Sequence, residues 1–150
     1  MKSIETKIER IKKKLQDSFY RLYMLDEYIT PFNIDTLRDI YEKNKGFISV
    51  YIRTASDDKS EEAIAKQIEK INKFCRKANY QYNKIYIDEG YSGSNEKRIK
   101  LEKILNDEES KVIIVSDLSI LARTTSGIEK LIKEYNKKYI AINNESILKK

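Results

Sequence analysis

The 150-residue chain contains no histidine and has only one cysteine, one proline and four glycines. Without histidine, a Ser-His hydrolytic triad and a histidine-based metal site are excluded, so acid–base work falls to Asp, Glu, Lys, Arg or Tyr. The single cysteine, Cys75, excludes an internal disulfide and favours a reducing compartment. The scarcity of proline and glycine argues against a loop-rich or low-complexity chain.

Long apolar runs are also missing. No stretch approaches the roughly 18 apolar residues of a membrane span, and the start MKSIETKIER has no apolar signal segment. We therefore expect a cytoplasmic protein with no membrane partner. Apolar residues make up 40% of the chain and charged residues 36%, which is typical of a globular protein with one hydrophobic core. The net charge of +6 and the pI of about 9.2 permit a polyanionic partner without singling one out.

The first thirty residues follow a heptad pattern. Residues recur at alternating steps of four and three, and only Ser18 is polar among them: Ile4, Ile8, Ile11, Leu15, Ser18, Leu22, Leu25 and Ile29. Pro31 is expected to end this helix, because proline disfavours helical backbone in the residue before it. Residues 1–45 are therefore predicted to be an N-terminal helical arm. The arm either packs on the neighbouring domain or forms a coiled coil that pairs two copies of the chain into a homo-oligomer.

A second, short helix completes this arm. It is expected in NIDTLRDIYEKN, with Asn33 or Asp35 as its cap. Ile34, Leu37 and Ile40 are predicted to lie on one side of it.

Residues 46–150 alternate short apolar runs with longer helical patterns. Strands are expected in FISVYI, NKIYIDE, KVIIVSD and YIAINN, and helices in EEAIAKQIEKINKFCRKAN, RIKLEKILNDEE and SGIEKLIKEYNKK. This alternation predicts an α/β fold with a mostly parallel sheet and helices on both faces. The strand in KVIIVSD is the most continuously apolar and should be central.

Ligands in such folds bind beyond the carboxyl ends of the strands. Three loops should meet there, at residues 53–59, 88–98 and 117–125. They carry the arginines Arg53, Arg98 and Arg123 together with Ser56, Asp88, Ser92, Ser94 and Ser119. Guanidinium groups at one edge require an anion, and their geometry matches phosphate oxygens, so a phosphodiester is the natural ligand. The alternative is that each arginine pairs separately with a surface acid.

Three motifs in these loops resemble the catalytic domain of serine recombinases, the resolvase/invertase family. They are YIRTASDD, YIDEGYSGSNEKRIKLEKIL and VIIVSDLSILARTTSGIEKLI, within residues 47–145. The resemblance implies a resolvase-like catalytic domain over residues 46–150, with DNA as its partner. It also implies that Arg53, Arg98 and Arg123 bind the scissile phosphate and that Asp88 and Ser92 help to organise the site. In this family a serine attacks DNA and forms a 5′-phosphoserine link within a tetramer, so no metal and no cofactor are expected.

Two positions depart from the family pattern. The attacking serine should lie two residues after Arg53, where this chain has Ala55, and the first arginine of the third motif is replaced by Ile120. Ser56 follows directly, but it replaces the missing hydroxyl only if the loop shifts by one residue. The sequence therefore predicts a degenerate serine-recombinase-like domain that binds DNA or assembles with an active recombinase.

Two alternatives remain at this stage. The first is an active site-specific recombinase that uses Ser56 as its nucleophile. The second, from another class, is a receiver-like signalling domain, because Asp117 follows the central strand where a phosphoacceptor would lie. Against the second stands the absence of an acidic cluster directly after the first strand.

Overall fold

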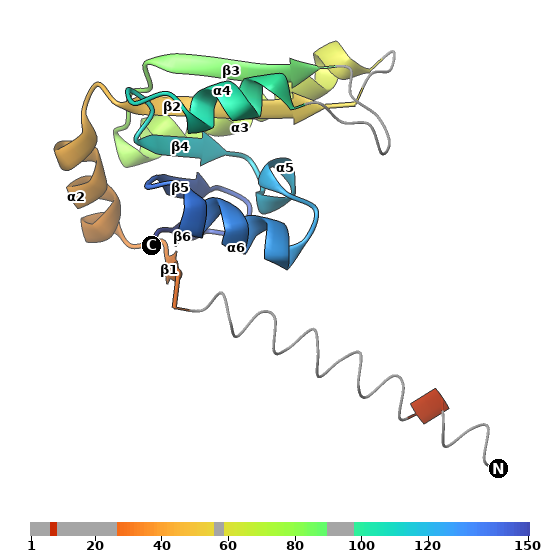
Figure 1. The fold of residues 1–150 in the computed structure, drawn as a ribbon. Helices are drawn as coiled ribbons and strands as arrows, with labels where there is room; N and C mark the ends of the chain where they lie inside the picture. Colours follow the sequence, from red (N-terminus) through yellow and green to blue (C-terminus); the bar gives the residue numbers. More distant parts are fainter. Residues whose placement is uncertain (1–6, 9–26, 56–58, 90–97) are drawn as a thin grey trace.

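The computed structural model describes residues 7–8, 27–55, 59–89 and 98–150. Within them the chain forms a single six-stranded sheet with the strand order β1-β6-β5-β4-β2-β3 (Figure 1). The elements are β1 (Ile29–Pro31), α2 (Ile34–Asn44), β2 (Ile48–Thr54), α3 (Ser60–Ala78), β3 (Lys84–Glu89), α4 (Ile99–Leu105), β4 (Val112–Val115), α5 (Leu118–Leu121), α6 (Thr125–Glu134), β5 (Lys138–Ala141) and β6 (Ser146–Leu148).

The centre of the sheet is parallel. β3, β2, β4 and β5 pair in parallel, whereas β6 runs antiparallel to β5, and β1 antiparallel to β6. The carboxyl ends of the four parallel strands therefore lie at one edge of the sheet, and their amino ends lie at the opposite edge. In Figure 1 the arrows of β2, β3 and β4 point toward the side that carries α5, away from α2.

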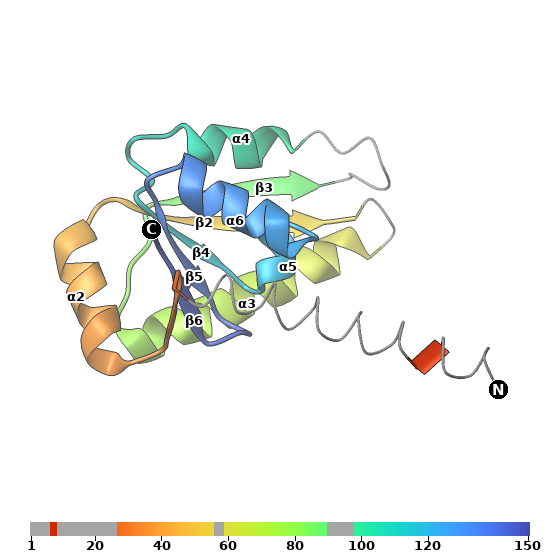
Figure 2. The ribbon, with the colours of Figure 1, turned by 60° about the horizontal axis from the view of Figure 1, so that its bottom comes forward.

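Helices cover both faces of the sheet, as predicted. Figure 2 shows α4 and α6 on one face and α3 on the other. The first face is packed by a buried cluster that includes Tyr51, Leu101, Ile104 and Ile132, and the second by one that includes Ile52 and Ile71. Among the described helices, none is both long and apolar enough to cross a bilayer.

The predicted core elements are confirmed. All four residues of β4 are fully buried between β5 and β2, in agreement with a central strand. α3 buries Ile71 and Cys75 as its amphipathic pattern predicts. Burial raises the pKa of the Cys75 thiol to about 11, so this cysteine is a packing residue.

The N-terminal prediction is partly wrong. Ile29 belongs to a strand and not to the heptad helix, because residues 29–31 pair with β6. α2 begins after Asn33, whose side chain accepts a hydrogen bond from the Asp35 amide. Leu37 and Ile40 are buried, whereas Ile34 in the first turn is 74% exposed. β1 and α2 thus contribute to the sheet and the core. Residues 9–26 lie outside the described part, so the coiled coil and the domain boundary at residue 45 stay predictions.

Candidate functional site

The carboxyl edge of the sheet brings together the ends of β2, β3 and β4. Arg53 near the end of β2 is the register partner of Asp88 near the end of β3. Because side chains alternate along a strand, Arg53 lies on the same face as Tyr51, which packs among residues of α4. Arg53 is half-buried. The sheet therefore directs this arginine toward α4.

Asp88 is the anchor of this edge. It is 1% exposed, and its carboxylate accepts three hydrogen bonds: from the Tyr51 hydroxyl at 2.7 Å, the Lys100 amide at 2.9 Å and the Leu101 amide at 3.0 Å. Two of these donors are unpaired amides in the first turn of α4, where a negative charge is also favoured by the helix dipole. Asp88 thus fixes the start of α4 to β2 and β3. Its contacts are those of a positioning residue, and direct contact with a phosphate stays a prediction.

The pKa of the Tyr51 hydroxyl depends on the charged residues around it. Burial and the hydrogen bond to Asp88 raise the pKa of the Tyr51 hydroxyl, while the positive charges of Arg98 and Arg53 act in the opposite direction. Two of the predicted arginines therefore lie within electrostatic reach of one buried hydroxyl. Tyr51 remains protonated near neutral pH and donates its proton to Asp88, so it is not a base here.

Arg98 connects the second loop to the third. It directly precedes α4, is half-buried, and its guanidinium donates a hydrogen bond to the carbonyl of Leu121 at the end of α5. Arg123 follows Leu121 by two residues and is exposed. The loops that carry Arg98 and Arg123 are thus tied together at this edge, as the sequence predicts.

Of the four serines predicted for the site, only Ser119 lies among the described residues. Ser119 is exposed in the first turn of α5, and its amide donates to Asp117 at 2.9 Å. Ser56, Ser92 and Ser94 lie outside the described residues. Ala55 is described and exposed directly after β2.

Asp117 is partly buried and accepts hydrogen bonds from Ser119 and Asn143. Partial burial raises its pKa, but hydrogen bonds from Ser119 and Asn143 outweigh this effect and leave the pKa lowered. No group of three or more residues suited to a metal ion occurs among the described residues. The receiver-like alternative gains no support from this arrangement.

Gln67 is a site residue that sequence reasoning missed. It reaches from α3 to the end of β2, where its amide nitrogen donates to the carbonyl of Arg53 at 2.9 Å. Its side-chain oxygen is buried and has no hydrogen-bond partner among the described residues. The available signal was a polar residue beside Ile64, Ile68 and Ile71 on the inner stripe of an amphipathic helix.

Comparisons with known proteins agree with this fold. The family model described as "Resolvase, N terminal domain" matches residues 48–146. The N-terminal catalytic domain of TP901-1 integrase is 23% identical with a TM-score of 0.58, over 65% of this chain and 79% of that one. The C-terminal catalytic domain of IS1535 TnpA, an IS607-like serine recombinase, is 23% identical with a TM-score of 0.53, over 63% and 70% of the two chains.

A third solved structure shares the fold. The C-terminal catalytic domain of ISC1926 TnpA, also an IS607-like serine recombinase, is 20% identical with a TM-score of 0.50, over 63% of this chain and 70% of that one. No curated protein sequence matches the chain. At these sequence identities the solved structures establish a shared fold, whereas membership of the family rests on the match to the family model.

Proposed function

The chain belongs to the resolvase family of serine recombinases, and from that premise we propose that it binds DNA at the carboxyl edge of its sheet without cutting it. One observation carries the proposal: the residue two positions after Arg53, where the family resemblance places the attacking serine, is Ala55, and it is exposed directly after β2. A methyl group there cannot form a phosphoserine link. The family's chemistry is therefore interrupted at its first step.

The binding half of the site is supported by the arginines. Arg53 and Arg98 both act on the Tyr51 hydroxyl, and Arg98 is bonded to the segment that precedes Arg123. Guanidinium groups match the oxygens of a phosphodiester and stay charged at any physiological pH. Asp88 supports them by fixing the start of α4. We propose that this group holds a DNA phosphate.

Besides the attacking serine, the chain lacks one of the arginines that the family resemblance places in the catalytic site. Ile120, at the position of the family's other arginine, is partly buried and packs against the cluster that contains Leu121. It provides packing where the family provides a cation. Loss of one transition-state donor costs about 2.7–4 kcal/mol in comparable sites, and loss of a nucleophile that acts as part of a unit costs many orders of magnitude in rate. Both changes point to a degenerate enzyme.

A binding domain without cleavage suits a role in recombination through DNA or through assembly with an active recombinase. The heptad residues supply the surface for such assembly in this proposal. Co-purification of the tagged chain with an active family member from the same source would support it. If no association is seen at micromolar concentrations of both proteins, the assembly role is abandoned and DNA binding alone remains.

The DNA-binding proposal is tested by matched arginine substitutions. Arg53→Gln with Arg123→Gln should weaken binding of a labelled duplex at least tenfold in fluorescence anisotropy at 0.1 M salt. Arg38→Gln with Arg76→Gln removes the same charge from exposed helix positions and should cost less than threefold. Equal losses in the two variants would show that only net charge matters. Arg98 is left unchanged because its bond to Leu121 also supports the fold.

A further inference from the structure

The amino edge of the sheet carries a pocket that has no part in the arginine site. It has a volume of about 280 Å³ and is lined by Asn44, Lys111, Asn136, Lys137, Lys138, Lys149 and Lys150. These residues come from the end of α2, from the segments before β4 and β5, from the start of β5 and from the segment after β6. The pocket therefore lies at the end of the sheet opposite to Arg53, near the point marked C in Figure 1.

The lining of this lysine pocket is unusual in its charge. Five of its seven residues are lysines, the other two are asparagines, and no carboxylate side chain is among them. Like charges gathered around one hollow repel each other unless an anion enters it. In the described part of the chain, none of the five lysines forms an ion pair with an acid. The pocket is therefore set up to receive negative charge.

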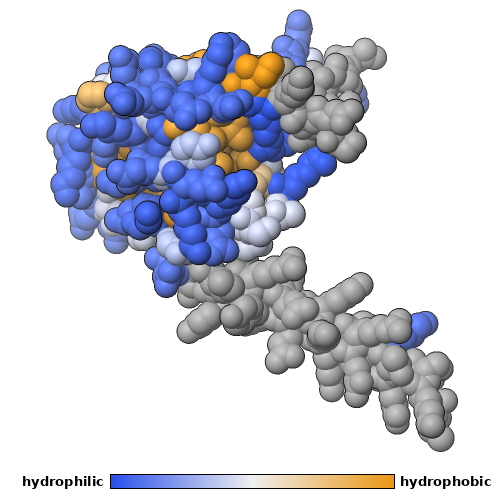
Figure 3. All heavy atoms as spheres, in the orientation of Figure 1, coloured by the Kyte–Doolittle hydropathy of each residue, from blue (hydrophilic) through white to orange (hydrophobic). Residues whose placement is uncertain are grey.

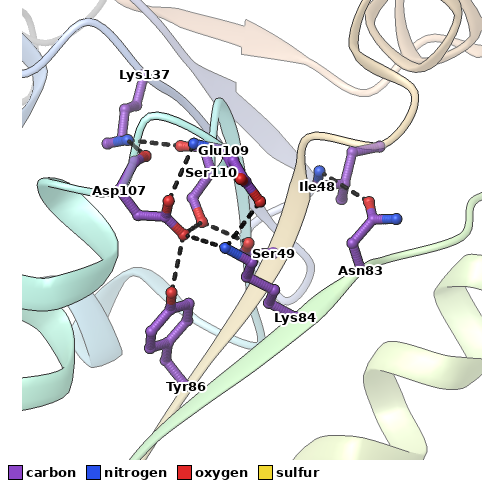
Figure 4. A network of polar contacts seen from close by, with 9 residues as sticks. All are labelled: Ile48, Ser49, Asn83, Lys84, Tyr86, Asp107, Glu109, Ser110 and Lys137. Carbon is purple, nitrogen blue, oxygen red and sulfur yellow. Dashed lines mark hydrogen bonds and ion pairs between the residues drawn. The ribbon is translucent and has the colours of Figure 1, made fainter.

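Two acids of the segment that contacts Lys137 already form ion pairs with another lysine. Asp107 and Glu109 both bind Lys84, at 3.0 Å and 3.1 Å, outside the pocket. Figure 4 shows this network with Lys137 beside it, donating to the carbonyls of Asp107 and Ser110 at 2.8 Å and 2.6 Å. These bonds hold the side chain of Lys137, which lines the pocket, in a fixed position. The positive charge is thus positioned by the fold and is not left to a mobile side chain.

The other lysines differ in mobility. Lys138 is half-buried at the start of β5, whereas Lys111, Lys149 and Lys150 are exposed. The Lys111 ammonium lies 4.5 Å from the centre of the Phe47 ring, which restrains it by a cation–π contact. A held lysine in the lining and exposed lysines around it suit an extended anion. Such an anion would lie across the opening of the pocket and place one of its charged groups inside.

Size and chemistry select the ligand. Pockets for organic ligands usually span about 300–1,000 Å³, so this one holds a phosphate group with its water but not a whole nucleotide. Lysine binds phosphate as a point charge and does not read base edges. A surface that inserts into a membrane would require apolar side chains beside the cations, and the lining residues include none. Figure 3 shows mostly hydrophilic residues on the face that it displays.

We propose that the lysine pocket is a second nucleic-acid contact that binds the phosphodiester backbone without sequence preference. It rests on the proposed function only in taking DNA as the partner, since it uses other residues at the opposite edge of the sheet. With both edges occupied, one domain would touch two DNA segments, or two parts of one bent segment.

The test compares two triple variants by fluorescence anisotropy on two duplexes of unrelated sequence. Lys111→Gln, Lys138→Gln and Lys149→Gln together should weaken binding to both duplexes at least tenfold at 0.1 M salt. The slope of log affinity against log salt should become shallower by about 2 or more, because each lost phosphate contact contributes about 0.9. The matched control replaces Lys73, Lys103 and Lys130, which are exposed on α3, α4 and α6 outside the pocket. The control should lose less than threefold.

Equal losses in the pocket variant and the control would overturn the proposal, provided that circular dichroism shows both to be folded. Inorganic tripolyphosphate and vesicles containing phosphatidylserine serve as competing probes. If the pocket substitutions abolish binding of either probe while DNA affinity stays unchanged, the pocket belongs to a small phosphorylated ligand or to a membrane, and the DNA assignment falls.

The arginine variant Arg53→Gln/Arg123→Gln separates the two proposals. If its DNA affinity equals that of the wild type while the lysine variant loses tenfold, the carboxyl-edge site fails and the lysine pocket stands. If only the arginine variant loses affinity, the lysine pocket is refuted.

Discussion

Replacing Asp88 by asparagine tests how the site is held together. The substitution preserves shape but removes the charge and one acceptor. In the wild type one carboxylate oxygen accepts from Tyr51 and Leu101, and the other accepts from Lys100. An asparagine oxygen can replace only one of them, so its amide nitrogen must face at least one N–H or O–H donor.

The expected cost follows from these contacts. A buried hydrogen bond to a charged group contributes about 1.5–3 kcal/mol, and the carboxylate at the start of α4 adds about 0.3–1 kcal/mol. Asp88→Asn should therefore lower the free energy of unfolding by about 2–4 kcal/mol. Tyr51→Phe removes one of the donors and should cost about 1–2 kcal/mol, with less than additive loss in the double variant because the two residues share a bond.

Urea unfolding at pH 7 measures both changes. The midpoint should fall while the slope stays constant, which identifies a change in stability and not in the unfolded state. Asp35→Asn is the control, because Asp35 is 91% exposed and its pair with Arg38 spans 3.9 Å. The control should change stability by no more than about 0.5 kcal/mol. If Asp88→Asn is as mild as the control, the carboxylate does not organise this edge.

Two further predictions concern stability. Partial burial raises the pKa of Asp107, but hydrogen bonds from Lys84, Tyr86 and their neighbours outweigh it and leave the pKa below its ordinary value. Asp107 therefore contributes stability that is present above the unfolded pKa of about 3.9 and is lost as pH falls toward the folded value. The difference in free energy of unfolding between the wild type and Asp107→Asn should be about 1–3 kcal/mol at pH 7. In urea unfolding this difference should shrink between pH 5 and pH 2, and a constant difference contradicts the prediction. Gln67→Met removes one hydrogen bond but also a buried oxygen that has no partner within the described ranges. Thermal unfolding should therefore show a stability within about 1 kcal/mol of the wild type or above it, and a loss beyond about 2 kcal/mol means that the oxygen has a partner.

The sequence was sufficient for the parallel centre of the fold. β2, β4 and β5 are read from runs of apolar residues that are buried from both sides, the edge strand β3 from the partly exposed run KIYIDE, and α3 from its inner stripe. β6 has three residues and forms a short antiparallel hairpin with β5, whereas β1, also of three residues, pairs with β6 at the far end of the chain. Such pairing leaves no local pattern, and Ile29 even continued the heptad steps. Tertiary pairing therefore overrode the local pattern at the N-terminus.

The charged residues of the site could be predicted from the sequence, but the contacts that hold them in place could not. Loop position at the ends of parallel strands was enough to bring Arg53 and Arg98 to one edge. The role of Asp88 required the first turn of α4, because only the helix start supplies two unpaired amides to its carboxylate. Gln67 was missed because one polar residue in an amphipathic helix is normally exposed. Its contact with the Arg53 carbonyl depends on how α3 packs on β2.

The proposal that the chain does not cleave DNA strands is tested most directly by a search for covalently bound DNA. The purified chain is incubated with fragmented genomic DNA from its source, denatured with detergent and isolated. Attached nucleotides are then located by mass spectrometry of its peptides. The account predicts unmodified peptides over residues 51–58 in the wild type. A nucleotide joined through phosphate to Ser56, absent from Ser56→Ala, would contradict it and establish an active recombinase with a displaced nucleophile.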